Sequence, residues 1–111
     1  MLTLHQKQVL FVQNVAKLIQ FAFSACEYEL TAGEFYRTPE QQARDYASGL
    51  SKTLDSQHTK RLAVDFNLFI NGVLQTDKNQ FKVLAEFWIN LHPNNKAGYF
   101  WGWDAGHFEM Q

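Results

Sequence analysis

The sequence predicts an α+β fold in which helices pack on one side of a small antiparallel sheet. Residues 4–25 and 76–92 each repeat apolar side chains at helical spacing, which is typical of helices that bury one face. Residues 62–70 instead alternate apolar and polar side chains, as a half-buried strand does. The Asn71-Gly72 pair that follows is a hairpin signal, so the predicted sheet is antiparallel.

The first helix is predicted to span residues 4–25. Thr3 and Gln6 have the spacing of a capping box, which satisfies free backbone N–H groups at a helix start. One face carries the apolar stripe Phe11, Val15, Leu18 and Ala22. Cys26, the only cysteine, cannot form a disulfide within the chain, and we expect it to pack as a small hydrophobic residue.

The next segment is predicted to deliver Arg37 to the start of a second helix. Residues 28–31 and 34–36 have the composition of extended chain. Thr38-Pro39 is a helix start signal, with proline in the first turn, and Gly49 is the expected end.

A polar and mobile loop is expected at residues 51–60, before the central strand at 62–70. In that strand Val64 and its alternate neighbours face one way, while Asp65 points away from the core face. After the third helix, which should stop before Pro93, we expect a loop at 94–97. Extended pieces are predicted at 99–103 and 107–110.

Length and composition indicate one domain, covering residues 1–111. Ten Phe and three Trp supply large apolar surfaces for a core without disulfides. A net charge of -1 and the lack of a basic run argue against nucleic-acid binding. Polar residues interrupt the apolar part of residues 4–25, so it is expected to be neither a membrane span nor an export signal. We expect a monomer.

Two distant segments, residues 56–65 and 103–109, hold the side chains of a catalytic zinc site. Such a site uses three protein ligands and leaves one position for a water molecule. His58, Asp65 and His107 are the candidate ligands. Asp104 lies three residues before His107, close enough to act as the general base. Taken singly, these residues could equally be a loop histidine, a strand-end charge and a core histidine.

Arg37 and Glu109 are further candidates with open roles. A guanidinium can bind a substrate carboxylate or stabilise an oxyanion. Arg37 is a cation beside a helix N-terminus, an unfavourable place for positive charge, and this favours a role on substrate over that of a plain surface residue. Glu109 could orient His107 from behind, or it could be a surface charge.

These motifs resemble those of a known family. Ser56-Gln57-His58 followed by Ala63-Val64-Asp65, the late run from Trp103 to Glu109, and the Glu34 to Gln42 stretch are similar to motifs of zinc peptidases that cleave peptidoglycan stem peptides. These are the VanY-type D-Ala-D-Ala carboxypeptidases and the L-alanyl-D-glutamate endopeptidases found as phage endolysins. The resemblance covers about residues 28 to 109.

The resemblance implies a hedgehog/DD-peptidase-like fold and a set of residue roles. It assigns Zn²⁺ to His58, Asp65 and His107, and makes Asp104 the base where many relatives have Glu. Arg37 is implied as a catalytic residue, and Gln42 and Ser56 as substrate-binding residues. Arg61 stands where many members have Gly, but the run from Lys60 to Asp65 resembles a phage-type branch of the family, so this departure bears on substrate preference more than on metal binding.

The implied function is zinc-dependent hydrolysis of an amide bond in the stem peptide, by a carboxypeptidase or an endopeptidase. Without an export signal, resemblance to endolysins implies synthesis in the cytoplasm and action on the periplasmic cell wall after release through a separate pore. The alternative is a non-catalytic, zinc-stabilised module that binds wall peptide or a protein partner. Asp104 distinguishes the two functions, because only a catalytic site needs a general base. A structural zinc site is normally closed by a fourth protein ligand, commonly Cys, and the motif provides none.

Overall fold

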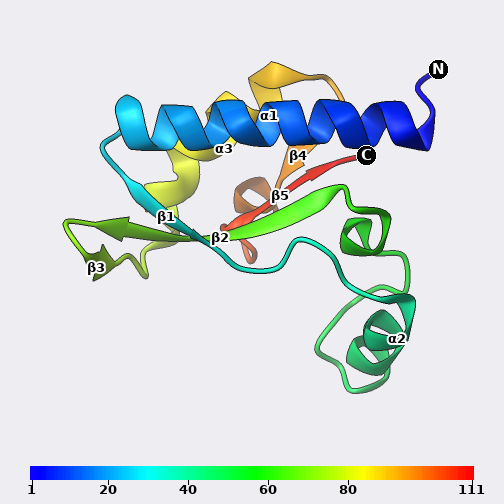
Figure 1. Cartoon of the computed structure of the whole chain (residues 1–111). Coiled ribbons are helices and arrows are strands. Elements are labelled where there is room, and N and C mark those ends of the chain that lie inside the picture. Colours follow the sequence, from blue (N-terminus) through cyan, green and yellow to red (C-terminus); the bar gives the residue numbers. More distant parts are fainter.

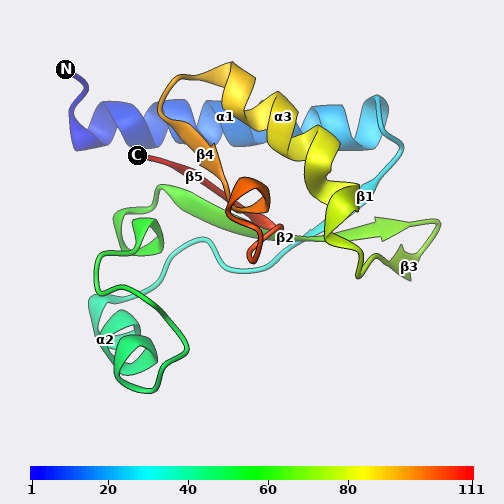
Figure 2. The same cartoon turned by 180° about the vertical axis from the view of Figure 1, so that it is seen from behind.

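Two helices cover one face of a single sheet in the computed structural model, which describes all residues 1–111 (Figure 1). Helices α1 (Leu4–Ser24) and α3 (Lys82–Leu91) contact each other and lie on the same side of the strands in both views (Figures 1 and 2). Helix α2 (Pro39–Ala47) lies away from this pair, next to the loop that follows it. The predicted α+β class is confirmed.

The sheet is antiparallel throughout. Its strands run in the order β1 (Glu29–Ala32), β2 (Ala63–Ile70), β5 (His107–Met110) and β4 (Asn95–Ala97), and β3 (Val73–Leu74) forms the predicted hairpin with β2. The pairing of β2 with β5 sets Asp65 opposite His107, although 42 positions separate them in sequence. The register therefore builds part of the candidate site.

The core lies between the sheet and the two helices. Val64 and Leu68 of β2 are fully buried, as the alternating pattern predicted, and so are Phe108 of β5 and Trp88 of α3. Burying such side chains stabilises the fold by roughly 1.5–3 kcal/mol each. The Trp88 indole N–H donates to the carbonyl of Lys96 at 3.0 Å, so its polar atom is satisfied within the core.

Helix α1 begins with the predicted capping box. The backbone N–H of Gln6 donates to Thr3 Oγ1 at 3.1 Å, and the backbone N–H of Thr3 donates to Gln6 Oε1 at 2.9 Å. The predicted apolar stripe is buried against the core. None of the helices combines the length and apolar character needed to cross a membrane.

Two predictions near the C-terminus were wrong. Residues 94–97 are not a loop, because Asn95–Ala97 form the short edge strand β4. The predicted extended piece at 99–103 is the 3₁₀ helix η3 (Gly98–Trp101), which ends at Gly102 with φ +88°. A three-residue strand is too short to show alternation, and β-favouring aromatic residues masked the turn.

Three other boundaries also differ from prediction. The third helix begins at Lys82 and follows the 3₁₀ helix η2 (Lys78–Phe81). Residues 34–36 form no strand, although the backbone N–H of Asp65 donates to the Glu34 carbonyl at 2.9 Å. The expected loop at 51–60 contains the 3₁₀ helix η1 (Gln57–Lys60).

Candidate metal centre and active site

The predicted site residues gather at one cleft with a volume of about 780 Å³. Its walls come from the segment 49–58, from β2 and from the segment 101–111, and most of the residues that line it are polar or charged. Arg37, Ser56 and Asp104 line this cleft together with the three candidate ligands, whereas Gln42 does not. Segments far apart in sequence thus form one pocket, as an active site requires.

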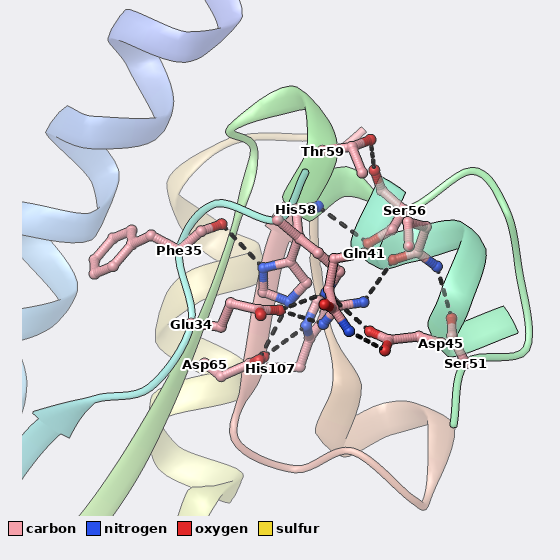
Figure 3. Close-up of polar contacts among 12 residues, drawn as sticks. Glu34, Phe35, Gln41, Asp45, Ser51, Ser56, His58, Thr59, Asp65 and His107 are labelled. Carbon is pink, nitrogen blue, oxygen red and sulfur yellow. Dashed lines mark hydrogen bonds and ion pairs between the residues drawn. The ribbon is translucent and has the colours of Figure 1, made fainter. Parts of the chain in front are cut away.

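Three donor atoms converge at the base of the cleft (Figure 3). His58 Nε2 lies 3.2 Å from Asp65 Oδ2, and His107 Nδ1 lies 2.9 Å from Asp65 Oδ1. All three donors fall within 4.8 Å of one another. Two imidazoles and one carboxylate at this separation form a donor set suited to zinc.

Local structure fixes the position of His58. The Ser56 hydroxyl accepts the backbone N–H of His58 at 3.2 Å, which caps η1. Helix η1 then ends at Arg61, whose φ of +58° is a left-handed conformation that favours glycine. The Arg61 guanidinium lies 4.1 Å from the Tyr36 ring centroid, and it does not line the cleft.

Both histidines are held with one ring nitrogen turned toward Asp65. His58 Nδ1 lies 3.0 Å from the Phe35 carbonyl, and His107 Nε2 lies 2.7 Å from Glu109 Oε1. Each of these nitrogens carries the proton that it donates to its partner oxygen, so the opposite nitrogen of a neutral ring keeps a lone pair for a metal. Glu109 is buried in this contact and is not a surface charge. The residues present therefore fit a zinc ion.

The acid–base properties of the group follow from these contacts. Burial alone would raise the pKa of Asp65, but hydrogen bonds from His107 and His58 hold it well below its usual range. Burial alone would lower the pKa of His107, but hydrogen bonds to Asp65 and Glu109 raise it to about 9. In the metal-free protein the cluster is thus a tightly paired anion and cation.

Asp104 stands beside the three donors and outside their group. Its Oδ2 lies 3.8 Å from His107 Nδ1, and its side chain is 39% exposed to the cleft. Burial raises its pKa, and the negative charge of Asp65 adds to the increase against the opposing charge of His107. A more basic carboxylate that is open to the cleft is suited to accept a proton.

Arg37 has more partners than the sequence indicated. Its Nε donates to Glu34 Oε1 at 2.6 Å, its Nη2 contacts the same oxygen, and its Nη1 donates to Gln42 Oε1 at 2.6 Å. Asp45 Oδ2 lies 3.6 Å from Nε. A guanidinium has five N–H groups, so two remain for a substrate oxygen. The acids that hold Arg37 were not foreseen, although Glu34 precedes it by only three residues.

Gln42 and Ser56 occupy different positions relative to the cleft. Gln42 is 1% exposed, and its Nε2 donates to Ser51 Oγ at 2.8 Å and to the Thr53 carbonyl. Both ends of its amide are therefore used inside the protein, which argues for a role in positioning Arg37 over the predicted contact with substrate. Ser56 does line the cleft, and its hydroxyl proton remains available there.

The remaining histidines take no part in the site. His5 is exposed on α1, and His92 Nδ1 accepts the backbone N–H of Asn94 at 3.1 Å.

Comparisons with known proteins agree with this geometry. The family model for phage L-alanyl-D-glutamate peptidase matches residues 4–110. The fold is similar to that of the L-Ala D-Glu endopeptidase ChiX of Serratia marcescens, with a TM-score of 0.74 and 20% sequence identity over 91% of this chain and 77% of that one. No curated protein matches the sequence. The match over nearly the whole chain shows that the protein belongs to the phage L-alanyl-D-glutamate peptidase family.

Proposed function

We propose that the protein is a zinc-dependent endopeptidase that hydrolyses the amide bond between L-alanine and D-glutamate in peptidoglycan stem peptides. Family membership supports the reaction and the bond. The observation that carries the zinc requirement is the convergence of three donor atoms within 4.8 Å, with Asp104 beside them in an open cleft.

His58 Nε2, His107 Nδ1 and an oxygen of Asp65 would hold the zinc ion. When bound, zinc polarises the scissile carbonyl and makes a water molecule acidic enough to attack at neutral pH. The buried Glu109 and the Phe35 carbonyl keep both imidazoles in the required tautomers.

The chain's own groups move the proton and steady the developing charge. Asp104 Oδ2 accepts a proton from the attacking water and returns it to the leaving D-glutamate amine, and its raised pKa suits both steps. Arg37 lines the cleft and keeps two N–H groups beyond those used by Glu34 and Gln42, and these would donate to the oxyanion or to a substrate carboxylate. The Ser56 hydroxyl offers a further donor at the cleft wall.

Two other functions make different predictions. A carboxypeptidase would release the terminal D-alanine, but the family match favours the L-alanyl-D-glutamate bond. A zinc-stabilised binding module would need no base and would normally have a fourth protein ligand. The donor group has three members, and an acid of raised pKa stands next to it, which favours catalysis.

Digestion of purified peptidoglycan by the zinc-loaded protein tests this proposal. Mass spectrometry should identify fragments with a new C-terminal L-alanine and a new N-terminal D-glutamate. The His107→Ala protein should produce neither and should contain less zinc by metal analysis. Free D-alanine would instead indicate a carboxypeptidase, and a zinc-containing protein that binds peptidoglycan without new termini would support the binding module.

A further inference from the structure

Two tryptophans form an exposed aromatic wall beside the candidate active site. The ring centroids of Trp101 and Trp103 lie 5.9 Å apart with 32° between the ring planes, and the Trp101 ring lies 5.4 Å from that of His107 at 38°. Both indoles line the cleft, with 40% and 59% of their surfaces exposed. We call this pair the aromatic shelf.

The proposed reaction leaves the aromatic shelf without a role. Proton transfer and charge stabilisation fall to Asp104 and Arg37, and neither Trp101 nor Trp103 belongs to the core. Two large apolar rings on the wall of an otherwise polar cleft are typical of a surface that stacks on a ring of the ligand. Trp101 lies beside His107, and Trp103 lies beside Trp101, so the shelf would contact a part of the substrate close to the scissile bond.

We propose that the aromatic shelf binds the muramic acid sugar to which the stem peptide is attached, an inference that rests on the proposed L-alanyl-D-glutamate cleavage. Only L-alanine and the lactyl group separate the scissile carbonyl from this sugar, a span of about 7 Å at roughly 3.5 Å per residue. The Trp101 ring centroid lies 5.4 Å from that of His107, and the Trp103 ring centroid lies 5.9 Å from that of Trp101. The sugar would therefore reach the shelf.

Charge favours the sugar over the other half of the substrate. The D-glutamate half carries carboxylates, and these would meet Asp104, which follows Trp103 in the chain, and Glu109, which is bonded to His107. A muramoyl sugar bears no charge, and it presents an apolar C–H face and a rim of hydroxyls. Lys52 Nζ lies 4.6 Å from the Trp103 ring centroid and carries three N–H donors suited to that rim.

Two soluble substrates test the inference. One is N-acetylmuramoyl-L-Ala-D-Glu-diaminopimelate, and the other is the same peptide with an acetyl group in place of the muramoyl group, so that the amine of L-alanine is acylated in both. The zinc-loaded wild type should show a kcat/KM about three- to tenfold higher on the muramoyl peptide, the range expected for one aromatic contact. In Trp103→Ala this ratio should fall to about one, and Trp103→Phe should restore part of it.

The ratio separates the sugar contact from damage to the neighbouring Asp104, which would lower both rates alike. Phe23→Ala, which removes an exposed aromatic ring that does not line the cleft, should keep the wild-type ratio. An equal rate on both substrates in the wild type, or an unchanged ratio in Trp103→Ala, would overturn the inference. If neither peptide is cleaved, the proposed function fails. Binding of the two peptides, measured by tryptophan fluorescence, still tests the sugar contact in that case. The muramoyl peptide should bind more tightly than the acetylated one only in proteins with an aromatic residue at position 103.

Discussion

Two aspartates of the cleft have different properties because their surroundings differ. Asp65 lies between two imidazoles, whose hydrogen bonds outweigh its burial and lower its pKa, so it remains an anion suited to a cation. Asp104 makes no such close bond, and burial raises its pKa. The same residue type can therefore serve as a ligand at one position and as a base at the other.

We predict that Asp104→Asn keeps zinc and fold but loses activity, because the amide is similar in shape but cannot accept the proton. General-base catalysis contributes typically ~10²–10⁴-fold, and kcat on the acetylated stem peptide should fall by about this factor. Zinc content and melting temperature should stay near the wild-type values. Asp55→Asn is the matched control, since Asp55 also lines the cleft but is exposed and paired with Lys60 at 3.0 Å. Wild-type turnover by Asp104→Asn would require a different base.

Arg37→Ala should cost both turnover and stability. The sequence alone predicted an effect on turnover and little else, but removal of the guanidinium leaves Glu34 and the buried Gln42 without their partner. We expect kcat to fall by about 10²–10³-fold, as when an oxyanion donor is removed, together with a lower melting temperature.

Arg37→Lys should recover part of the stability but little of the rate, because an ammonium lacks the planar fork. Arg44→Ala on the same helix is the control, since Arg44 is exposed and bonds only Gln41. Steady-state kinetics and thermal melts of the three variants show whether Arg37 acts on turnover, on stability or on both. A drop in melting temperature without any change in kinetics would make Arg37 purely structural.

For single residues, the sequence indicated which side chains belong to the candidate site better than it indicated what those side chains contact. His58, Asp65 and His107 could be chosen because metal ligands come from few residue types and the motif spacing was informative. The burial of Gln42 could not be foreseen, since it depends on Ser51 and Thr53 folding back over its amide. The contact between Glu109 and His107 was one of two possibilities, and only the β5 geometry decided between them.

At the scale of elements, the chain reversal between η3 and β5 presents both Asp104 and His107. Gly98 lies against it so closely that an added Cβ would stand 1.9 Å from the Asp104 carbonyl oxygen. That carbonyl also accepts the backbone N–H of His107 at 3.1 Å. Close backbone contact at Gly98 therefore sets the position of Asp104 relative to His107.

Gly98→Ala should displace this chain reversal. Activity should fall by more than the loss of folded protein explains. The clash is with backbone, which cannot rotate away, and overpacking of this kind costs typically 1–3 kcal/mol. We expect a lower melting temperature and a reduced kcat in the fraction that is folded. Gly102→Ala is the control, because Gly102 has φ +88° but open space around its Cα. It should lose stability by about 1 kcal/mol while keeping its kcat. Equal kinetics in the two variants would show that Gly98 does not position Asp104.

The elements that sequence predicted well are those with long periodic patterns. α1 has several turns and a capping box, and β2 has an unbroken alternation, so both boundaries fell within one or two residues. β4 and η3 are three and four residues long, and their structure depends on partners elsewhere in the chain. Pairing of Asn95–Ala97 with β5 makes the strand, and no local pattern could show that pairing.

For the whole molecule, β2 and β5 join the core to the candidate metal centre. Val64 and Phe108 face the helices, while their neighbours Asp65 and His107 face the cleft. A metal held between these two strands would bind the folded chain and not the unfolded one, so it should stabilise the entire domain. The α+β class was predictable, because it follows from the order of helical and strand patterns.

This coupling predicts a specific dependence of stability on pH. Without metal, the pKa of His107 is about 9 in the folded protein and about 6.5 in an unfolded chain. A raised pKa contributes stability that is complete below about 6.5 and is lost as pH rises through about 9. Zinc needs the unprotonated Nδ1 of His107, so zinc affinity should increase over the same interval.

The melting temperature of the metal-free protein should therefore fall between pH 6.5 and pH 9. Over the same interval, the increase in melting temperature that excess zinc produces should become larger. Thermal melts with and without zinc at pH 6.5, 7.5 and 8.5 measure both effects. Glu109→Gln replaces the charged acceptor of one of the hydrogen bonds that raise the His107 pKa, so in that variant the fall in melting temperature should be smaller and both changes should be complete at lower pH. A zinc-induced increase that is the same at every pH would mean that zinc does not displace the His107 proton, and His107 would then not be a ligand.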